Sequence, residues 1–277
     1  MLNENPAEKV LSDAALFLKQ QAELYGDDIY LIPEGTNKDP SGSFISTASE
    51  LRPENKTESE TDLKPKVIKI SEDEGLFEGA VLNSEWKIDP KWHDSDSLEV
   101  LNSRTSGCKK CPLGNTRKSF VFGVGNPKAK LVLIGEAPGA DEDEQGEPFV
   151  GRAGQLLTKI LAAVQLRRED VYICNILKCR PPNNREPLPT EIESCEPYLK
   201  KQLDIIKPKL ILCLGRVAGQ ALLRMNTSLA EFRNNMYEYQ GIKVMVTYHP
   251  AALLRNPNWK RPAWEDVQKM RKLYDEL

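Results

Sequence analysis

The stretch KLVLIGEAPG, residues 130–139, joins an unbroken apolar run to a turn rich in glycine and proline. Unbroken apolar runs of this length are typical of strands that are covered on both faces in a parallel sheet. Three similar runs follow, VYICNIL at 171–177, LILCLG at 210–215 and KVMVTYH at 243–249. The sequence therefore predicts four buried strands, the first of which leads into the turn at 135–139.

Helical patterns separate and follow these runs. They are AGQLLTKILAAVQL at 153–166, TEIESCEPYLKKQLDII at 190–206, VAGQALLR at 217–224 and WEDVQKMRKLYDEL at 264–277. This alternation predicts an α/β fold in which helices lie on both faces of a parallel sheet. Such sheets bind ligands outside the carboxyl ends of their strands, and the residues at those ends are Gly135, Glu136, Asn175, Gly215 and His249.

The charge is divided unevenly along the chain. Residues 1–95 carry 10 Lys or Arg and 20 Asp or Glu, a net charge of −10, whereas residues 96–277 carry 28 and 21, a net charge of +7. This asymmetry indicates two parts with different functions. A basic part with this charge attracts phosphate only modestly, so charge alone does not identify a nucleic-acid partner.

Three segments are predicted. Residues 1–30 form a helical segment, because apolar positions recur at helical spacing within 7–25; this helix either packs on the body or binds a protein partner. Residues 31–96 are acidic and rich in Pro, Ser and Thr, so they bury too little apolar surface to fold and form a disordered linker. Residues 97–277 form the folded domain.

The location of the protein is suggested by two patterns that the sequence lacks. No apolar run approaches the roughly 20 residues that span a bilayer. The N-terminus does not have the charged-then-apolar pattern of a signal peptide. We therefore expect a cytoplasmic protein that does not enter a membrane and whose cysteines do not form disulfides.

All six cysteines lie in the basic part of the chain. Two of them form a CxxC pair, one follows the second strand and one lies in a helical pattern; these are Cys108, Cys111, Cys179 and Cys195. Thiolates in such a set hold tetrahedral zinc or an iron–sulfur cluster, and their spacing does not separate the two. Unconnected thiols are the alternative, and they suit Cys174 and Cys213, which fall inside strand patterns.

Three longer motifs carry a family resemblance. GEAPGADEDEQGEPFVGRAGQLL at 135–157, NILKCRPPNNREP at 175–187 and YHPAALLR at 248–255, in this order and with the four cysteines, resemble the iron–sulfur uracil-DNA glycosylases, family 4 of that superfamily. The resemblance covers about residues 100–275. It implies a three-layer α/β/α sandwich around a central four-stranded parallel sheet, and hydrolysis of the N-glycosidic bond of deoxyuridine in DNA, which leaves an abasic site.

The resemblance also implies a cofactor and a set of uracil-binding residues. It places a [4Fe-4S] cluster, with zinc as the alternative, on the four cysteines named above. It implies that uracil is held by the backbone of Glu136, Ala137 and Pro138 and by Phe149, Asn175 and His249. The expected partner is uracil-containing DNA, and we expect the protein to act as a monomer.

The chemistry of uracil removal suits these residue types. Phe149 offers a face on which a flipped base stacks. The Asn175 amide combines an acceptor and a donor, so it pairs with N3–H and O4 of uracil, whereas cytosine would leave both groups mismatched. A neutral His249 can donate a hydrogen bond to uracil O2 as negative charge develops on the leaving base.

The group that positions the attacking water is less defined. Some other uracil glycosylase families have an aspartate where this sequence has Ala137, so an aspartate base does not carry over. Glu136 and Glu142 are the remaining nearby carboxylates, and Glu142 is the preferred candidate for water activation or for stabilising the oxocarbenium-like sugar.

Residues after the last strand are candidates for contacting DNA. Leu253 or Leu254 can fill the gap that the flipped base leaves, although either can equally pack in the core. Arg255 can meet a phosphate. Two alternatives compete with an enzyme: a non-catalytic nucleic-acid-binding protein of the same fold, and a nucleotide-binding enzyme that uses GEAPG as a phosphate loop. The second ranks low because the motif lacks the lysine and the glycine spacing of known phosphate loops.

Overall fold

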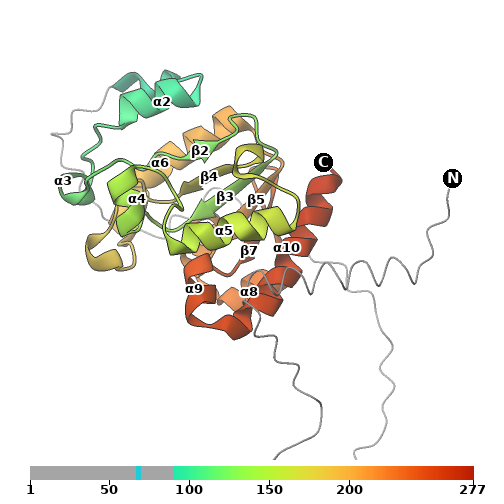
Figure 1. Cartoon of the computed structure of the whole chain (residues 1–277). Helices are drawn as coiled ribbons and strands as arrows, with labels where there is room; N and C mark the ends of the chain where they lie inside the picture. The colour runs from blue at the N-terminus through green and yellow to red at the C-terminus, as the bar shows by residue number, and fades with distance from the viewer. Residues whose placement is uncertain (1–66, 70–89) are drawn as a thin grey trace, which may run out of the picture. The chain divides into compact units, whose positions relative to one another are not determined.

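The structure, a computed structural model, describes residues 67–69 and 90–277, all of which belong to one compact unit (Figure 1). The helical segment predicted at 1–30 lies outside the described residues, as does most of the linker predicted at 31–96. Among the described residues, no helix combines the length and the apolar character needed to cross a membrane.

A seven-stranded sheet in the order β1-β6-β7-β5-β3-β4-β2 runs through this unit. The strands are β1 Val67–Lys69, β2 Val124–Gly125, β3 Leu131–Gly135, β4 Tyr172–Asn175, β5 Leu210–Leu214, β6 Met236–Tyr239 and β7 Ile242–Thr247. The four predicted strands, β3, β4, β5 and β7, are parallel neighbours at its centre, which confirms that prediction. The sequence analysis missed the edge strands β1 and β2 and the strand β6 next to β1, which are too short or too mixed in polarity to stand out.

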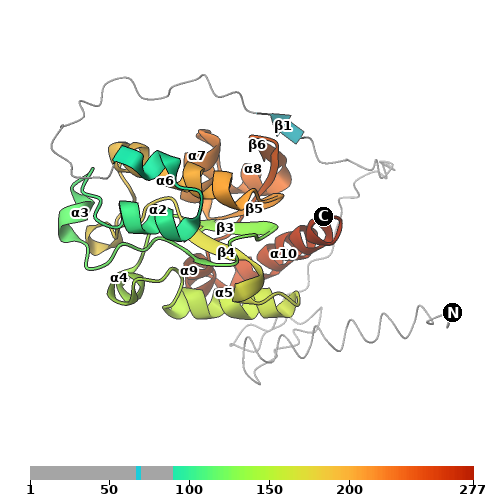
Figure 2. The same cartoon turned by 90° about the horizontal axis from the view of Figure 1, so that it is seen from above.

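Helices cover both faces of the sheet, so the three-layer α/β/α arrangement is confirmed (Figure 2). They are α2 Leu98–Thr105, α3 Leu113–Thr116, α4 Ala140–Gln145, α5 Arg152–Ala163, α6 Pro189–Ile206, α7 Arg216–Leu223, α8 Leu229–Asn234, α9 Pro250–Arg255 and α10 Lys260–Asp275. Short 3-10 turns lie at η1 Pro90–Asp94, η2 Arg168–Asp170, η3 Pro182–Asn184 and η4 Pro257–Trp259. Helices α2, α6 and α7 lie on one side of the sheet, and α5, α9 and α10 on the other.

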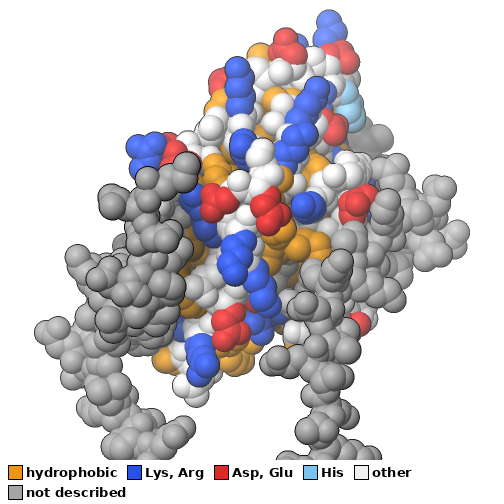
Figure 3. Space-filling view, turned by 90° about the vertical axis from the view of Figure 1, so that its right-hand side faces the viewer, with side chains coloured by type: hydrophobic (Ala, Val, Ile, Leu, Met, Phe, Trp, Pro, Cys, Tyr) orange, Lys and Arg blue, Asp and Glu red, His pale blue; other side chains and the backbone are white. Residues whose placement is uncertain are grey.

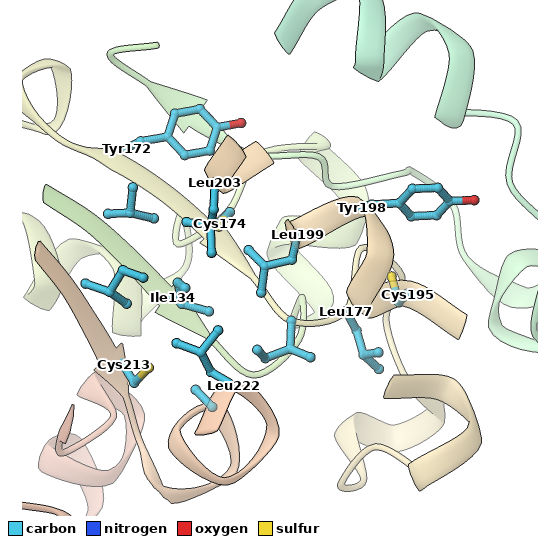
Figure 4. Packing of buried hydrophobic residues seen from close by; sticks show 14 of the residues in the cluster. Ile134, Tyr172, Cys174, Leu177, Cys195, Tyr198, Leu199, Leu203, Cys213 and Leu222 are labelled. Carbon is cyan, nitrogen blue, oxygen red and sulfur yellow. The ribbon is translucent and has the colours of Figure 1, made fainter. Parts of the chain in front are cut away.

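The two sides have separate cores, which explains why β3 is apolar throughout. Val132 and Ile134 belong to the core beneath α6, whereas Leu131 and Leu133 belong to the core beneath α5. Successive side chains of a strand point to opposite faces, so both sets are buried. Figure 4 shows the α6 side, where Leu199 and Leu203 lie over the sheet among Ile134, Cys174 and Cys213. Both of these thiols are buried in strands, as the sequence analysis suggested.

The described body begins close to the predicted boundary at residue 97. Ser97 caps α2, because its Oγ accepts the Val100 N–H at 3.3 Å. The preceding turn η1 also packs on the body, because Trp92 is buried. The centroids of the Trp92 and Tyr198 rings lie 4.9 Å apart, and the ring planes are inclined at 73° in a T-shaped contact. The described residues therefore include a few, 67–69 and 90–96, that lie inside the range 31–96.

The strand order fixes where a ligand can bind. From β3 the chain crosses to β4 on one side and then to β5 on the other, so the direction of winding reverses between β3 and β5. Such a reversal opens a crevice at the carboxyl ends of the strands. Gly135 ends β3 and Asn175 ends β4, while Gly215 and His249 follow β5 and β7. The predicted site residues therefore share one edge of the sheet.

Charges of both signs are mixed on the side of the body that faces right in Figure 1. Figure 3 shows Lys and Arg side chains there interspersed with acidic and apolar ones.

Candidate active site

Gly135 is the point at which two of the predicted uracil-binding side chains meet. A methyl group built on its Cα would lie 2.3 Å from Asn175 Oδ1 and 2.6 Å from Phe149 Cζ. Any side chain at position 135 would displace one or both of these groups. The glycine thus allows an amide from β4 and an aromatic ring from the loop after α4 to lie against the end of β3.

Asn175 carries a buried acceptor that has no partner. The residue is 2% exposed, and its Oδ1 makes no hydrogen bond within the described residues. An unsatisfied buried polar atom costs about 1–3 kcal/mol, so such an atom calls for a structural or functional explanation. Its backbone carbonyl, in contrast, accepts the Lys178 ammonium at 2.8 Å, and that ammonium also donates to Gln202 Oε1 at 2.6 Å.

Phe149 has an unusual backbone and a buried ring. Its φ is +55°, a conformation that aromatic residues rarely adopt. The side chain is 6% exposed, and its ring lies 5.5 Å from the His249 ring, centroid to centroid, with 33° between the planes. The carbonyl oxygens of Pro148 and Phe149 accept the Arg168 guanidinium at 2.8 and 3.1 Å.

His249 is held in one tautomer. It precedes α9, and its Nδ1 accepts the Ala251 N–H at 3.1 Å, so the hydrogen of the neutral ring is on Nε2. Burial lowers the pKa of His249 to about 4, and the nearby Arg255 adds to this effect. At neutral pH the ring is therefore uncharged and presents an N–H donor.

Glu136 begins the loop after β3 and is half-buried. Burial raises the pKa of its carboxyl to about 7, Glu186 adds to the rise and Arg216 opposes it. Arg216 is itself paired with Glu186 at 3.0 Å. The next residues, Ala137 and Pro138, carry the chain toward α4, with Pro138 buried and Ala137 packed against the core.

The Glu142 carboxylate accepts hydrogen bonds from backbone N–H groups that lie on both sides of its own helix, α4. Oε1 accepts the N–H groups of Val150 and Gly151, both at 2.9 Å, and Oε2 accepts the Gly139 N–H at 3.1 Å. One side chain on α4 therefore joins the residue before that helix, Gly139, to the end of the loop that contains Phe149. These contacts favour a structural use of Glu142 over the water activation predicted from the sequence.

The predicted DNA-contacting residues separate into two kinds. Leu253 is 3% exposed and packs in the core, whereas Leu254 is 40% exposed on the same helix, α9. Arg255 is also exposed and ends that helix. Because His249 caps the start of α9, Leu254 and Arg255 lie on the surface within two turns of the candidate site.

The four predicted ligand cysteines gather in one region. Cys195 lies on α6, Cys179 follows β4, and Cys108 and Cys111 lie between α2 and α3. These cysteines lie close enough together that negative charge on one thiolate raises the pKa of a neighbouring thiol. Charge on Cys111 and on Cys108 raises the pKa of Cys179 in this way. Burial is the main cause that raises the pKa of Cys179 to about 11 and that of Cys195 to about 12.

Donor groups point at three of these sulfurs. The Arg117 guanidinium donates to Cys179 Sγ at 3.0 Å, the Tyr198 hydroxyl to Cys108 Sγ at 3.2 Å and the Lys178 backbone N–H to Cys195 Sγ at 3.3 Å. Across residues 67–69 and 90–277, no three His, Cys, Asp or Glu side chains are arranged to hold a single metal ion. The sulfurs thus share a region supplied with positive charge and N–H donors.

The sequence analysis did not name three side chains that contact the site. They are Arg117, Arg168 and Lys178, which bond to Cys179, to the Phe149 loop and to Asn175 respectively. Lys178 directly precedes a predicted ligand, so its position in NILKC was a usable signal. Arg168 lies 19 residues after Phe149, and no motif links the two.

Comparison with known proteins agrees with this geometry. The sequence model of the uracil DNA glycosylase superfamily matches residues 122–268. A type-4 uracil-DNA glycosylase of Archaeoglobus fulgidus is 47% identical over 186 residues, which are 64% of this chain and 94% of the relative. The chain belongs to the type-4 family of uracil-DNA glycosylases. The resemblance seen in the sequence is thereby confirmed.

Other members of the superfamily match over similar lengths. A type-4 uracil-DNA glycosylase of Thermotoga maritima is 44% identical over 176 residues, or 62% of this chain and 92% of the relative. A type-5 uracil-DNA glycosylase of Thermus thermophilus is 33% identical over 149 residues, or 47% of this chain and 68% of the relative. The greater similarity to type-4 relatives agrees with the motifs that the sequence analysis selected.

Proposed function

We propose that this protein is a uracil-DNA glycosylase that flips uracil out of DNA and hydrolyses its N-glycosidic bond. The observation that carries the proposal is the Asn175 Oδ1 atom, a buried acceptor without a partner that lies beside the Phe149 ring on Gly135. In this proposal a flat base stacks on the Phe149 ring, and an N–H at the edge of the base meets the Asn175 acceptor. Type-4 family membership supports the same reaction.

Recognition of uracil falls to Phe149 and Asn175 in this proposal. The base stacks on the Phe149 ring, which is worth about 1–3 kcal/mol for a base on an aromatic face. Asn175 Oδ1 accepts uracil N3–H and its amide nitrogen donates to O4. The backbone of residues 136–138 borders the other side of the base.

Cleavage transfers charge between base and sugar. As the bond between C1′ and N1 breaks, its electron pair goes to uracil and positive charge develops on the sugar. His249 Nε2–H donates to uracil O2 and stabilises that leaving group as its negative charge grows. The neutral form is sufficient, because the Ala251 N–H already fixes the tautomer.

Water then bonds to C1′ and leaves an abasic site. We assign the water-positioning role to Glu136, since a carboxyl with a pKa of about 7 is partly ionised at neutral pH and can accept the proton of water. Glu142 instead orders the loop through its three backbone N–H partners. The negative charge of ionised Glu136 also stabilises the positive charge that develops on the sugar.

DNA is held by the surface of α9. Leu254, exposed beside the site, fills the gap that the flipped base leaves, and Arg255 meets a phosphate. Leu253 supports that helix from the core. Uracil-containing DNA is thus the proposed partner.

We also propose that Cys108, Cys111, Cys179 and Cys195 hold a [4Fe-4S] cluster. The donor chemistry fits: N–H and guanidinium groups directed at sulfur are common around clusters, whose bound thiolates carry negative charge. The cluster, when bound, links the segment between α2 and α3 to α6 and to the loop after β4. Hydrolysis needs no electron transfer, so its role is structural.

The reaction is tested with purified, cluster-loaded protein and labelled oligonucleotides that contain uracil in single strands, in U·A pairs or in U·G pairs. We expect release of free uracil and alkali-labile abasic sites, with none from matched thymine-containing DNA. Tight binding to the same DNA without base release would support the non-catalytic alternative instead.

The cofactor is tested on the same sample. A protein purified without oxygen should be brown, absorb broadly in the visible range, and contain about four iron atoms and four sulfides per chain, as a [4Fe-4S] cluster requires. Replacing Cys195 by Ser should lower the iron content, whereas Cys213→Ser should not. A colourless protein with stoichiometric zinc would establish the zinc alternative.

A further inference from the structure

The carbonyl side of the Phe149 loop is bonded by a residue from outside the loop. Arg168 lies at the start of η2, the turn between α5 and β4, and reaches back with Nη2 to the Pro148 carbonyl and with Nη1 to the Phe149 carbonyl. Two neighbouring carbonyls are thus held by one rigid, planar fork. Burial lowers the pKa of Arg168, but a guanidinium keeps its charge in proteins.

The amide side of the same loop is held by a carboxylate. Glu142 Oε1 accepts the N–H groups of Val150 and Gly151, the two residues after Phe149. Gly154 leaves room for the loop, since a methyl group there would lie 1.8 Å from the Phe149 carbonyl oxygen. Two side chains of opposite charge therefore fix the backbone immediately before and after the strained residue.

Such fixing is needed because the φ of +55° at Phe149 is unfavourable for an aromatic residue. If the Arg168 contacts were lost, the peptide would be free to relax toward a common conformation and the ring would turn with it. The ring lies close to Gly135 and to the His249 ring, so a small rotation would remove it from the base-binding position.

We propose that Arg168 is a positioning residue for base recognition, which holds the Phe149 ring where it stacks on the flipped uracil. This inference rests on the proposed function of the site. Arg168 itself touches neither base nor sugar in this arrangement; it acts through the two carbonyls.

Three variants separate this role from general effects of charge: Arg168→Ala, Arg168→Lys and, as a matched control, Arg167→Ala. Arg167 is the exposed neighbour, bonded to Asp170 and Glu169. We expect Arg168→Ala to lower kcat/KM on uracil-containing DNA by about tenfold, the scale of losing hydrogen bonds to a charged donor, and Arg168→Lys to restore part of it. Arg167→Ala should match the wild type.

Two further measurements distinguish positioning from folding. DNA that carries a tetrahydrofuran abasic analogue has no base to stack, so Arg168→Ala should bind it as the wild type does. In a Phe149→Ala background the ring is absent, and Arg168→Ala should cause no further loss; double-mutant cycles of this kind isolate coupling. Additive losses, or equal weakening on tetrahydrofuran DNA, would overturn the proposal.

The activities of the wild type and of the Arg168→Ala variant together distinguish a wrong role for Arg168 from a wrong function for the site. Wild-type protein that neither releases uracil nor prefers uracil-containing DNA would contradict both. Wild-type protein that is active, with an Arg168→Ala variant equally active, would contradict the role of Arg168 alone.

Discussion

Replacing His249 by alanine is expected to slow uracil release by about 10²–10³-fold, because that is the usual effect of removing one donor from a developing negative charge. The donor is Nε2–H, because Nδ1 accepts the Ala251 N–H. The pKa of His249 is lowered to about 4, so the ring is neutral at neutral pH. Single-turnover rates of base release measure the effect, and affinity for tetrahydrofuran DNA should change little.

His249 also caps α9, so the loss of the cap must be separated from the loss of the donor. His249→Asp keeps an acceptor for the Ala251 N–H but cannot donate from an ionised carboxylate, and it should be as slow as the alanine variant. His93→Ala changes the other histidine, which is exposed and stacks on Trp92, and should have no effect. Equal loss of catalysis and DNA binding in His249→Ala would indicate a structural role.

Replacing Asn175 by aspartate is expected to shift selectivity from uracil toward cytosine. An ionised aspartate offers only acceptors, so it faces uracil O4 without a donor but accepts the amino group of cytosine. Each mismatched contact costs about 1–3 kcal/mol, and we expect uracil excision to fall by roughly 10–100-fold while the ratio of cytosine to uracil excision rises. Paired assays on uracil- and cytosine-containing oligonucleotides measure that ratio.

A matched control lies in the turn before β3. Asn126 uses its Oδ1 to accept the Lys128 N–H, and aspartate preserves that contact, so Asn126→Asp should leave both rates unchanged. Discrimination that stays at the wild-type level in Asn175→Asp would remove Asn175 from base recognition.

The central fold could be predicted because its strands are buried on both faces. Residues 131–134 are unbroken in apolar character since alternate side chains enter two different cores. The strands outside this centre lack the signal: in β6, MYEY, only Tyr237 is buried. A strand that is covered on one face and short in length does not stand out from a loop.

The candidate site could be located but not fully described. Asn175 and His249 lie at the carboxyl ends of predicted strands, so a parallel sheet brings them to one edge. The sequence did not indicate that the Glu142 carboxylate accepts hydrogen bonds from backbone N–H groups. Nor did it indicate that Arg168, which follows α5 in the chain, donates to the Phe149 carbonyl. Both depend on the path of a loop in space, which no periodic pattern encodes.

The lone acceptor of Asn175 connects activity to the stability of the free protein. Oδ1 has no hydrogen-bond partner among the described residues, and an unsatisfied buried acceptor costs the folded state about 1–3 kcal/mol. In the proposed mechanism the same acceptor recognises uracil. An apolar residue of similar size at position 175 is therefore expected to raise the free energy of unfolding and to lower uracil excision.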